Sequence, residues 1–459
     1  MIEELYKFKD YSPDLKIKQF NNIYIVYFET LCNVSLINDF ILKPISYYKL
    51  KTINDIKNKL PNGNITEISD KNKLYELLFS GFTIVIINDS SIAVETKFEL
   101  NSSIAEATNE KVIKGPKDAF TENYQINLGL IRKRIRSKDL VVIEHIIGTS
   151  SKSKVSLLYM DNIANHNLVN KIEKKLKNLN IDYIANSNYI YEKLDKENSM
   201  MPTNLMTERP DLVSFMLMEG RIAILTENTP QVIIIPAFFG DFIKNIDDYY
   251  QNSKNVSVTR FIRLIAFLIA LLTPGLYIAI TTFNQETLPT QVLINFSIQR
   301  EGVPFPSIIE AIIMMISFEI LREADTRIPY VIGTSMSIVG ALVLGEAAVE
   351  AGLISPIMII VIAISSVSSF LFNNNDVVNF IRIWKTVFLI LGAFAGIYGI
   401  FIATLLFLLK LSSTESYGYD YTFPSAPFSF VEQKNNIFLI NNFKLNKRNI
   451  VLSKKNFRR

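Results

Sequence analysis

The chain has 459 residues, of which 49% are hydrophobic and 20% charged, and its formal net charge is only +4. Its one cysteine, Cys32, excludes an intramolecular disulfide, and its first residues, MIEELYKFKDYSPDLK, lack the apolar core of a signal peptide. The stretch from about residue 260 to 410 is overwhelmingly apolar, whereas the first 250 residues are rich in Lys, Asn and Asp. We therefore expect a soluble half followed by a membrane half.

Two pairs of segments in the first half resemble each other. The segment YFETLCNVSLINDFI, from Tyr27, matches YMDNIANHNLVNKIE, from Tyr159, at an offset of 132 residues. A second match, at an offset of 139 residues, relates LLFSGFTIVIIND around Gly81 to FMLMEGRIAILTEN around Gly220. The first pair follows short apolar strands, and in the second pair Gly stands between a helical run and a strand. Two matches in the same order predict tandem α/β subdomains.

An amphipathic helix is predicted between the repeats, within DAFTENYQINLGLIRKRIRSKDL, because its apolar residues follow helical spacing. The end of this helix is basic, with Arg132, Lys133, Arg134, Arg136 and Lys138. Two interpretations stay open: a solvated helix end, which the helix dipole favours, or a contact with lipid headgroups. No motif for reading nucleic acid accompanies the cluster, so no nucleic-acid partner is expected.

Polar residues also gather in two short motifs of the second repeat, TERPD (Thr207 to Asp211) and EGR (Glu219 to Arg221). We interpret them as candidate interface elements. Their charged side chains would form a polar network that fixes neighbouring subdomains. These side chains are Glu208, Arg209, Asp211 and Arg221.

Four uncharged runs in the second half are long enough to cross a membrane, and we interpret them as four spans. They are residues 264–285, 328–345, 351–375 and 386–409. The first run has 22 residues, which corresponds to about 33 Å of helix. It contains Pro274 and Gly275, which predict either a static kink or a hinge. In the second run, small residues recur at every fourth position, which lets helices approach closely.

Basic residues next to these runs predict the orientation, because short basic flanks stay in the cytosol. Arg260 and Arg263 precede the first run, and Lys410 and a basic tail follow the last. Both ends are therefore expected in the cytosol, which an even number of spans satisfies. Arg382 and Lys385 would then lie on the outer side, against the same rule.

The stretch REGVPFPSIIEAIIMMISFEILREADTRIP is apolar but rich in ionisable residues. Its longest uncharged run within the helix, AIIMMISF, would cover about 12 Å, so residues 301–325 are not expected to form a simple span. Glu310 and Glu319 fall on opposite sides of a helix, and Glu319 and Arg322 are spaced for pairing. Two interpretations are open: an interfacial elbow helix, or an elbow or partly re-entrant helix packed in an assembly. The second predicts gating or interface roles for Glu310, Glu319 and Arg322.

The third run contains a cluster of serines in VIAISSVSSFLF. Their hydroxyls could bond to the helix's own backbone four residues back. Alternatively, they form a polar stripe facing a water-filled path. The candidate pore-lining residues on this second interpretation are Ile362, Ser365, Ser366 and Ser369.

No catalytic constellation stands out in the sequence. His145 and His166 lack companions at metal-ligand spacing, and GTSSKSK, from Gly148, lacks the second glycine of a phosphate-binding loop. We expect neither an enzyme nor a bound cofactor or metal.

Several blocks of the sequence resemble the A subunit of the spore germination receptors of endospore-forming bacteria, the GerA family. They include KGPKDAFTENYQINLGLIRKRIRSKDL, TERPDLVSFMLMEGRIAIL, TPQVIIIP and SIVGALVLGEAAVEAGLISPIMIIV, together with the charged stretch described above. The resemblance covers about residues 15 to 425. It implies a multi-pass protein of the spore inner membrane, with its N-terminal domain and C-terminal tail cytosolic. It also implies a transporter-like B subunit and a lipoprotein C subunit as partners.

The predicted fold class is an α/β soluble N-terminal half, of two tandem α/β subdomains, followed by an α-helical polytopic membrane domain. The expected parts are subdomains at 1–110 and 111–255, a membrane domain at 256–412 with four spans and the elbow helix, and a basic cytosolic tail at 413–459. The first functional hypothesis is a germinant-gated ion channel subunit that works as a homo-oligomer in contact with membrane lipid. The second is a non-conducting scaffold or signal-relay subunit of the same receptor. A secondary transporter is a weaker third hypothesis, because no inverted repeat is found among the spans.

Overall fold

The computed structural model describes residues 2–48, 50, 52–61, 64–68, 70–88, 90–98, 105–107, 109–194, 201–327, 345–372, 374–433, 435–436, 439, 447–449, 451–453 and 456. The chain divides into two compact units. The first unit comprises Met1–Ser199, Thr203–Ala237 and Asn441–Arg459. The second unit comprises Met200–Pro202 and Phe238–Ile440.

The first unit begins with a five-stranded sheet in the order β1-β2-β4-β5-β3, in which every pairing is antiparallel. Its strands are β1 (Leu15–Phe20), β2 (Ile23–Phe28), β3 (Ile65–Glu67), β4 (Phe82–Ile87) and β5 (Ser90–Glu95). Its helices are α1 (Ile2–Asp10), α2 (Val34–Ile37), η1 (Asn38–Leu42), α3 (Lys43–Tyr47), α4 (Ile53–Lys59) and α5 (Lys71–Phe79).

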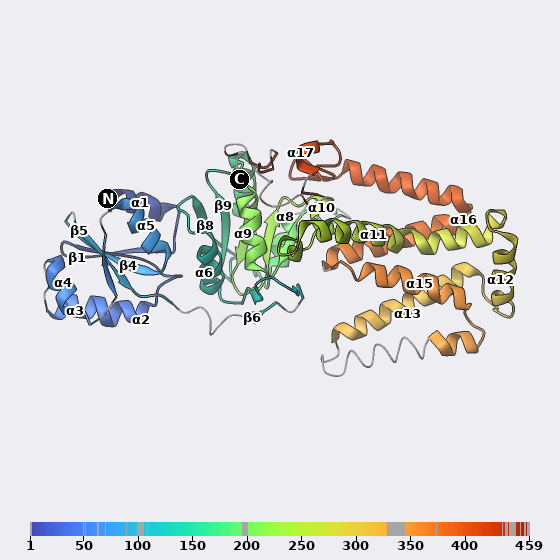
Figure 1. Ribbon diagram of the computed structural model, residues 1–459, viewed down its shortest axis with the longest axis horizontal. Coiled ribbons are helices and arrows are strands. Elements are labelled where there is room, and N and C mark those ends of the chain that lie inside the picture. The colour runs from blue at the N-terminus through green and yellow to red at the C-terminus, as the bar shows by residue number, and fades with distance from the viewer. Residues whose placement is uncertain are drawn as a thin grey trace. The chain divides into compact units, whose positions relative to one another are not determined.

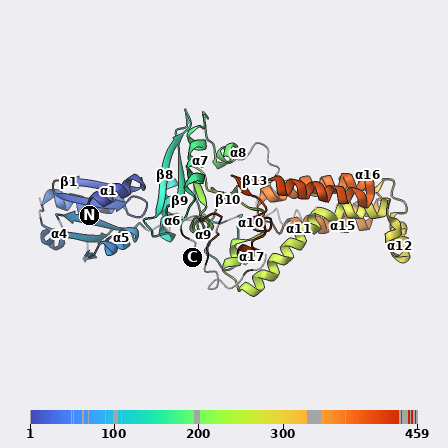
Figure 2. The same cartoon turned by 90° about the horizontal axis from the view of Figure 1, so that it is seen from above.

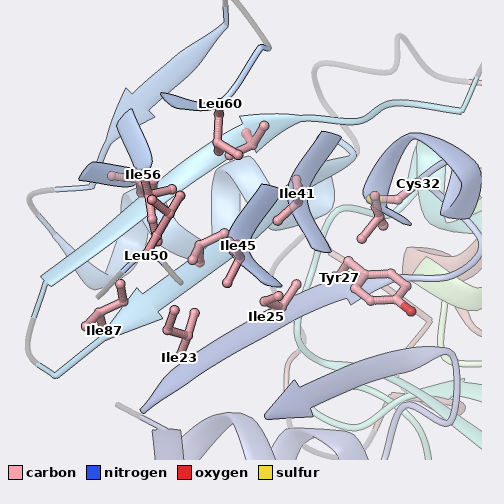
Figure 3. Packing of buried hydrophobic residues seen from close by; sticks show 14 residues of the cluster. Ile23, Ile25, Tyr27, Cys32, Ile41, Ile45, Leu50, Ile56, Leu60 and Ile87 are labelled. Carbon is pink, nitrogen blue, oxygen red and sulfur yellow. The ribbon is translucent and has the colours of Figure 1, made fainter. Parts of the chain in front are cut away.

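Both faces of this sheet are buried under helices, since side chains alternate between the faces along each strand. On β2, Ile23, Ile25 and Tyr27 belong to the core beneath α2, α3 and α4, and Figure 3 shows this packing. Val26 and Phe28 face the opposite core, which α1 and α5 cover (Figure 1). The sheet is therefore the middle of three layers.

A second sheet of five strands has the order β8-β9-β11-β12-β10, again wholly antiparallel. Its strands are β8 (Leu140–Ile147), β9 (Ser153–Met160), β10 (Leu205–Thr207), β11 (Ile222–Thr226) and β12 (Val232–Ile235). The associated helices are α6 (Tyr124–Arg134), α7 (His166–Lys177), α8 (Ser187–Leu194) and α9 (Pro210–Met218), and a small ladder joins β6 (Ala105–Glu106) to β7 (Asp118–Ala119).

The two sheets share one topology, because β1 to β5 and β8 to β12 occur in the same spatial order. The two sequence matches occupy corresponding places in it. Asn33 and Asn165, in the first match, each follow the second strand and cap the next helix through the side-chain oxygen. Gly81 and Gly220, in the second match, each end a helix with a positive φ, of 84° and 94°, a conformation that favours glycine. The repeat in the sequence is thus a repeat of structure.

The basic end of α6 joins the two halves of this unit. Arg132 is fully buried and donates from Nε and Nη2 to the two carboxylate oxygens of Asp14, each at 2.7 Å. Thr30 donates to the same carboxylate at 2.9 Å, and Arg134 pairs with Asp118. Two of the five cations are therefore used inside the chain, which leaves fewer for a solvated end or a headgroup contact.

The second unit is mainly helical. Its helices are α10 (Phe239–Ile243), η3 (Ile246–Tyr249), α11 (Ser253–Thr282), η4 (Gln285–Thr287), α12 (Thr290–Arg300), α13 (Ser307–Arg327), α15 (Pro356–Ser369), α16 (Asn375–Ser413) and α17 (Phe430–Gln433), with a short ladder of β13 (Glu415–Ser416) and β14 (Tyr419–Asp420). α11 packs along both α15 and α16 (Figure 2). By length and composition, α11 and α16 are the two described helices that could cross a membrane, and α15 is a shorter apolar helix.

The predicted spans meet different outcomes. The first run, 264–285, lies almost wholly within the continuous helix α11. The second, 328–345, lies outside the described residues except for its last position. The third was expected over 351–375, but the helix there, α15, has only 14 residues because it begins at Pro356 and ends at Ser369.

The fourth predicted span, 386–409, is wrong as a single straight helix. Gly396 has a φ of 59° and a ψ of −141°, which breaks the helical path of α16. The ring centroids of Trp384 and Phe407, on opposite sides of the break, are 5.1 Å apart, whereas a straight helix would separate these residues by about 35 Å. α16 is therefore a helical hairpin with two antiparallel arms. The apolar run did not reveal the turn, although three glycines, Gly392, Gly396 and Gly399, lie around it.

The turn of the hairpin is fixed against the end of α11. The side-chain oxygen of Asn284 accepts a hydrogen bond from the amide of Ile397 at 3.1 Å. Lower down, α11 and α16 approach so closely that a Cβ on Gly392 would stand 2.7 Å from the carbonyl oxygen of Gly275. Glycine at both positions is what permits this backbone contact.

The stretch expected as a basic tail is folded wherever the structure describes it. In the second unit, Arg260 donates to the carbonyls of Asn435, at 3.1 Å, and Asn436, at 2.8 Å. In the first unit, Arg448 donates to the carbonyl of Met218 at 2.9 Å, and Leu452 is buried. Both units thus include part of the C-terminal stretch.

Candidate functional site

The contact between α15 and α11 is built around a proline. Pro274 has no amide hydrogen, so the carbonyl of Ala270, four residues earlier, loses its helical donor. The hydroxyl of Ser365 on α15 donates to this carbonyl at 2.8 Å. Ser365 is fully buried there. The carbonyl that Pro274 leaves without a helical donor is therefore bonded by Ser365, one of the predicted pore-lining residues.

The other candidate pore-lining residues are also buried in the described chain. Ile362 is fully buried in a core cluster with Tyr277, Ala311 and Met358. Ser369 donates to the carbonyl of Ser366, three residues earlier on the same helix, at 2.6 Å. The alternative of hydroxyls bonded to their own backbone thus holds for Ser369, while Ser365 bonds to a neighbouring helix. A pore-lining role for the four residues remains a prediction.

Glu310 of α13 is fully buried and reaches the start of α15. Its Oε2 accepts hydrogen bonds from the amide of Ser355, at 2.9 Å, and from the Ser355 hydroxyl, at 2.8 Å. Ser355 is the N-cap of α15, where a negative charge also meets the positive end of the helix dipole. Glu310 therefore acts as the capping group of a neighbouring helix.

The rest of this cluster is incompletely bonded. Among the described residues, the second carboxylate oxygen of Glu310, Oε1, has no hydrogen-bond partner, and Nη2 of Arg300 lies 3.7 Å from it. The Nε of Arg300 and the hydroxyls of Ser307 and Tyr277 are buried and also lack a partner of normal geometry there. Unpaired buried polar atoms cost free energy, and four of them gather at this point.

Glu319 lies on the other side of α13 and pairs with two arginines. The pair with Arg322, predicted from the spacing of three residues, forms. Arg382, on the first arm of α16, pairs with the same carboxylate oxygen. Glu310 and Glu319 thus contact different neighbours, which answers why this apolar stretch keeps its charges.

In the first unit, three of the four predicted network residues come together. The buried Arg209 donates to both carboxylate oxygens of Asp211, at 3.1 and 2.7 Å, and to the carbonyls of Glu110 and Pro116. Glu208 accepts from the amides of Asn109 and Glu110, both at 2.8 Å. The motif TERPD therefore fastens the segment that precedes α6. Arg221 bonds elsewhere, to the carbonyl of Pro236 at 2.7 Å.

The acid held by this network has an unusual proton affinity. Burial raises the pKa of Glu110 to about 7, although the hydroxyl of Thr207 and the amide of Glu208 both donate to its carboxylate. The negative charge of Glu208 also raises this pKa, and Arg209 lowers it. The pKa of Glu110 thus lies near neutral pH.

The described residues contain no group of three or more His, Cys, Asp or Glu side chains that could hold a metal ion. The clusters above are hydrogen bonds and ion pairs, between helices in the second unit and between TERPD and the segment before α6 in the first. Comparison with known proteins identifies the type of molecule.

The family model described as Bacillus/Clostridium GerA spore germination protein matches residues 3–451. The chain belongs to the GerA family. Spore germination protein KA of Bacillus subtilis (strain 168) is 34% identical over 437 residues, covering 93% of this chain and 80% of that protein. Spore germination protein GerQA of Bacillus cereus is 32% identical over 442 residues, covering 95% and 88%. The relationship predicted from the sequence blocks is therefore confirmed.

A solved structure of a GerA-family fragment is also similar. It is the N-terminal domain of the A subunit of the Bacillus megaterium spore germinant receptor GerK3, with 28% sequence identity and a TM-score of 0.38. The similarity covers 52% of this chain and 94% of that one.

Several residues of this GerA-family chain were missed by sequence reasoning. Ser355, which contacts Glu310, lies 45 residues from it in another block. Arg300 lies 10 residues from Glu310 in the same charged stretch, but the sequence did not predict their contact. Lys385 is only 8% exposed on α16 and forms no hydrogen bond or ion pair with another described residue. A lysine within an apolar run was the available signal for Lys385. Glu110 carried no signal, because its pKa depends on a fold that joins it to TERPD.

Proposed function

We propose that this GerA-family chain is the A subunit of a nutrient-responsive spore germination receptor and forms, as a homo-oligomer, an ion channel that opens when germinant is sensed. Its place is the spore inner membrane, with a transporter-like B subunit and a lipoprotein C subunit as partners. Family membership supports the receptor role. The contacts among α11, α15 and α16 support the channel role.

The helical unit supports four membrane crossings that differ from those read from the sequence. The ring of Phe267, on α11, lies 6.0 Å from that of Phe372, just after α15, and 6.5 and 6.2 Å from those of Phe380 and Phe407, on the two arms of α16. The turn of the hairpin lies instead at the far end of α11, beside Asn284. α11, α15 and the two arms therefore alternate in direction, and four crossings return the chain to its starting side.

This arrangement also explains how both chain ends can be cytosolic although Arg382 and Lys385 were expected on the outer side. Arg382 and Lys385 were expected on the outer side, against the preference of basic residues for the cytosol. They lie on the first arm of α16, between Phe380 and Phe388, and so within the half of the bundle nearer to the start of α11. Their long side chains can extend from there towards the cytosolic surface. The N-terminal domain and the C-terminal tail are then both cytosolic.

The observation that carries the channel proposal is the hydrogen bond from Ser365 to Ala270. It is a polar contact between two apolar helices, at the point where Pro274 interrupts one of them. In our proposal the ion path opens along this seam when α15 moves away from α11. Ile362, Ser365, Ser366 and Ser369 would then line the path, with hydroxyl and carbonyl oxygens available to ions.

Reconstitution of the purified full-length chain in liposomes tests the proposal. We expect potassium flux, and we expect Ser365→Val to change the rate of flux at least several-fold, because the freed carbonyl of Ala270 then has no donor. Ser365→Thr keeps the hydroxyl and should retain flux close to that of the natural protein. Ile364→Val, at a residue that is 48% exposed on the same helix, is the matched control. Absence of flux from a correctly folded oligomer contradicts the channel role.

A second candidate function is a non-conducting scaffold or signal relay. It is favoured by the burial of all four candidate pore residues in the described chain and by the TERPD network, which would serve as an interface. On this hypothesis liposomes containing the A subunit alone show no conductance, while substitutions in the network still impair germination. The liposome measurement therefore separates the two candidates.

A further inference from the structure

A cavity in the helical unit carries features of a ligand site that no function above uses. It has a volume of about 580 Å³ and lies between the end of α11, η4 and α12. Small-molecule sites commonly occupy roughly 300–1,000 Å³. Here the polar lining comes from Thr281, Gln285 and Ser297 and from two residues of opposite charge, Arg300 and Glu301, and the other four lining residues are apolar.

Arg300 is the positively charged residue of this lining. It separates the cavity from the buried Glu310, whose Oε1 lies 3.7 Å from its Nη2, beyond hydrogen-bond distance. Its Nε is buried and has no hydrogen-bond partner among the described residues. A guanidinium offers five donors in a planar fork. The side chain of Arg300 is 28% exposed, and Nη2 has only its long contact with Glu310 in the described part of the chain.

The group that fits such a fork is a carboxylate, which can accept two parallel hydrogen bonds from one guanidinium. The neighbouring lining suits a short apolar body, because Leu288, Leu293 and Phe296 stand beside Arg300. Glu310 forms no hydrogen bond with Arg300, because its Oε2 accepts from Ser355 and its Oε1 lies 3.7 Å from Nη2.

We propose that this cavity binds a small organic carboxylate through the unused donors of Arg300. The ligand carboxylate then competes with Glu310 for the arginine. Glu310 keeps its bonds to Ser355 and so remains attached to the start of α15. Binding of the carboxylate thereby alters the contact of Glu310 with the start of α15, and Ser365 lies towards the other end of this helix.

The proposed binding is argued from the cavity alone, whereas its effect on α15 rests on the proposed function. Different experiments test the binding and the effect. Loss of ion flux with retained binding counts against the channel, and loss of binding with retained flux counts against this site.

Titration of the purified full-length chain with butyrate and with butyramide tests the binding step. The two molecules have similar size, but butyramide lacks the charge that Arg300 would recognise. We expect saturable binding of butyrate by calorimetry and at least tenfold weaker binding of butyramide. Arg300→Gln should weaken butyrate binding at least tenfold, and Arg322→Gln, at an arginine paired with Glu319, should leave it unchanged.

A second variant guards against a folding defect in Arg300→Gln. Leu293→Trp fills the cavity while Arg300 stays in place, and it should also abolish butyrate binding. Equal binding of butyrate and butyramide, or butyrate binding that survives both Arg300→Gln and Leu293→Trp, overturns the proposal. So does the absence of saturable butyrate binding to the folded natural protein, the result expected if a neighbouring protein fills the cavity.

Discussion

Two buried charged residues, Arg209 in the first unit and Glu310 in the second, are bonded to different extents. In the first unit, Arg209 directs Nε, Nη1 and Nη2 to acceptors, and its partner Asp211 is bonded through both oxygens. In the second unit, Glu310 is fully buried with one oxygen bonded and the other unpaired. Completed contacts hold segments in place, while incomplete ones leave a polar group ready for another partner. The comparison predicts that disruption of a completed ion pair mainly lowers stability, whereas a change at Glu310 mainly alters function.

The largest expected effect is the loss of a completed ion pair. Asp14→Ala leaves the buried Arg132 without its carboxylate, which typically costs about 3–5 kcal/mol. The unique thiol of Cys32 is buried in the same unit, so its labelling rate in increasing urea reports the unfolding. The matched control, Asp39→Ala, removes an exposed partner of Lys43 and should cost under about 1 kcal/mol. Equal effects of the two changes contradict the role given to Arg132.

The next effect concerns the turn of the α16 hairpin. Gly396→Ala forces a side chain into a backbone region that favours glycine and places its Cβ 2.7 Å from the side-chain oxygen of Asn284. Such strain costs on the order of 1–3 kcal/mol. Fluorescence of Trp384, the single tryptophan, reports the hairpin because the residue packs on Phe407. Gly302→Ala, also at positive φ but with open space around its Cβ, should perturb this signal much less.

A smaller effect is expected from the titration of Glu110. Its pKa of about 7 in the folded chain exceeds the ordinary value of 4.5, so the folded state binds the proton more tightly than the unfolded state. The resulting stability is present below pH 4.5 and is lost as pH rises through 7. After allowance for partial exposure, the loss is about 1–2 kcal/mol. Melting temperatures from pH 5 to 8 should fall less steeply in Glu110→Gln; an identical pH dependence would rule out this assignment.

The smallest effect on stability, with the clearest effect on function, is expected for Glu310→Gln. The amide oxygen still accepts from Ser355, so the melting temperature should change little, while the charge facing Arg300 disappears. We expect impaired germination of spores that carry this variant, measured as the response to nutrient. Glu319→Gln should impair germination or assembly as well, because it weakens the contacts with Arg322 and Arg382. Normal germination of spores carrying either variant would instead support the interfacial elbow helix, in which these charges contact only lipid headgroups.

Much of the first unit could be predicted from the sequence because its signals are local. Asn33 and Asn165 cap helices after equivalent strands, and Gly81 and Gly220 end equivalent helices. The same residue types at equivalent positions therefore allowed the repeat to be predicted. The strand order was not predicted, since pairing depends on contacts between distant segments.

The helical unit was less predictable because apolar sequences carry little information about where a helix turns. The reversal at Gly396 falls within an apolar run, and α15 begins at Pro356 and ends in the serine cluster at Ser369, inside a run long enough to predict a full span. The partners of Ser365 and Glu310 also depended on the fold, since Ala270 lies 95 residues before Ser365 and Ser355 lies 45 residues after Glu310. The sequence singled out Ser365 and Glu310 as candidates but did not predict the residues that they contact.

The most direct test of the central claim uses thiol accessibility on α15. In a Cys32→Ser background, which removes the single natural cysteine, cysteine is introduced one position at a time by Ile362→Cys, Ser365→Cys, Ser366→Cys and Ser369→Cys. A charged thiol reagent is then applied to the assembled receptor with and without germinant. The account predicts that these positions become reactive when ions flow, and that modification alters the flux. Positions that stay unreactive while ions flow, beside a reactive Ile364→Cys control, would contradict an ion path along α15.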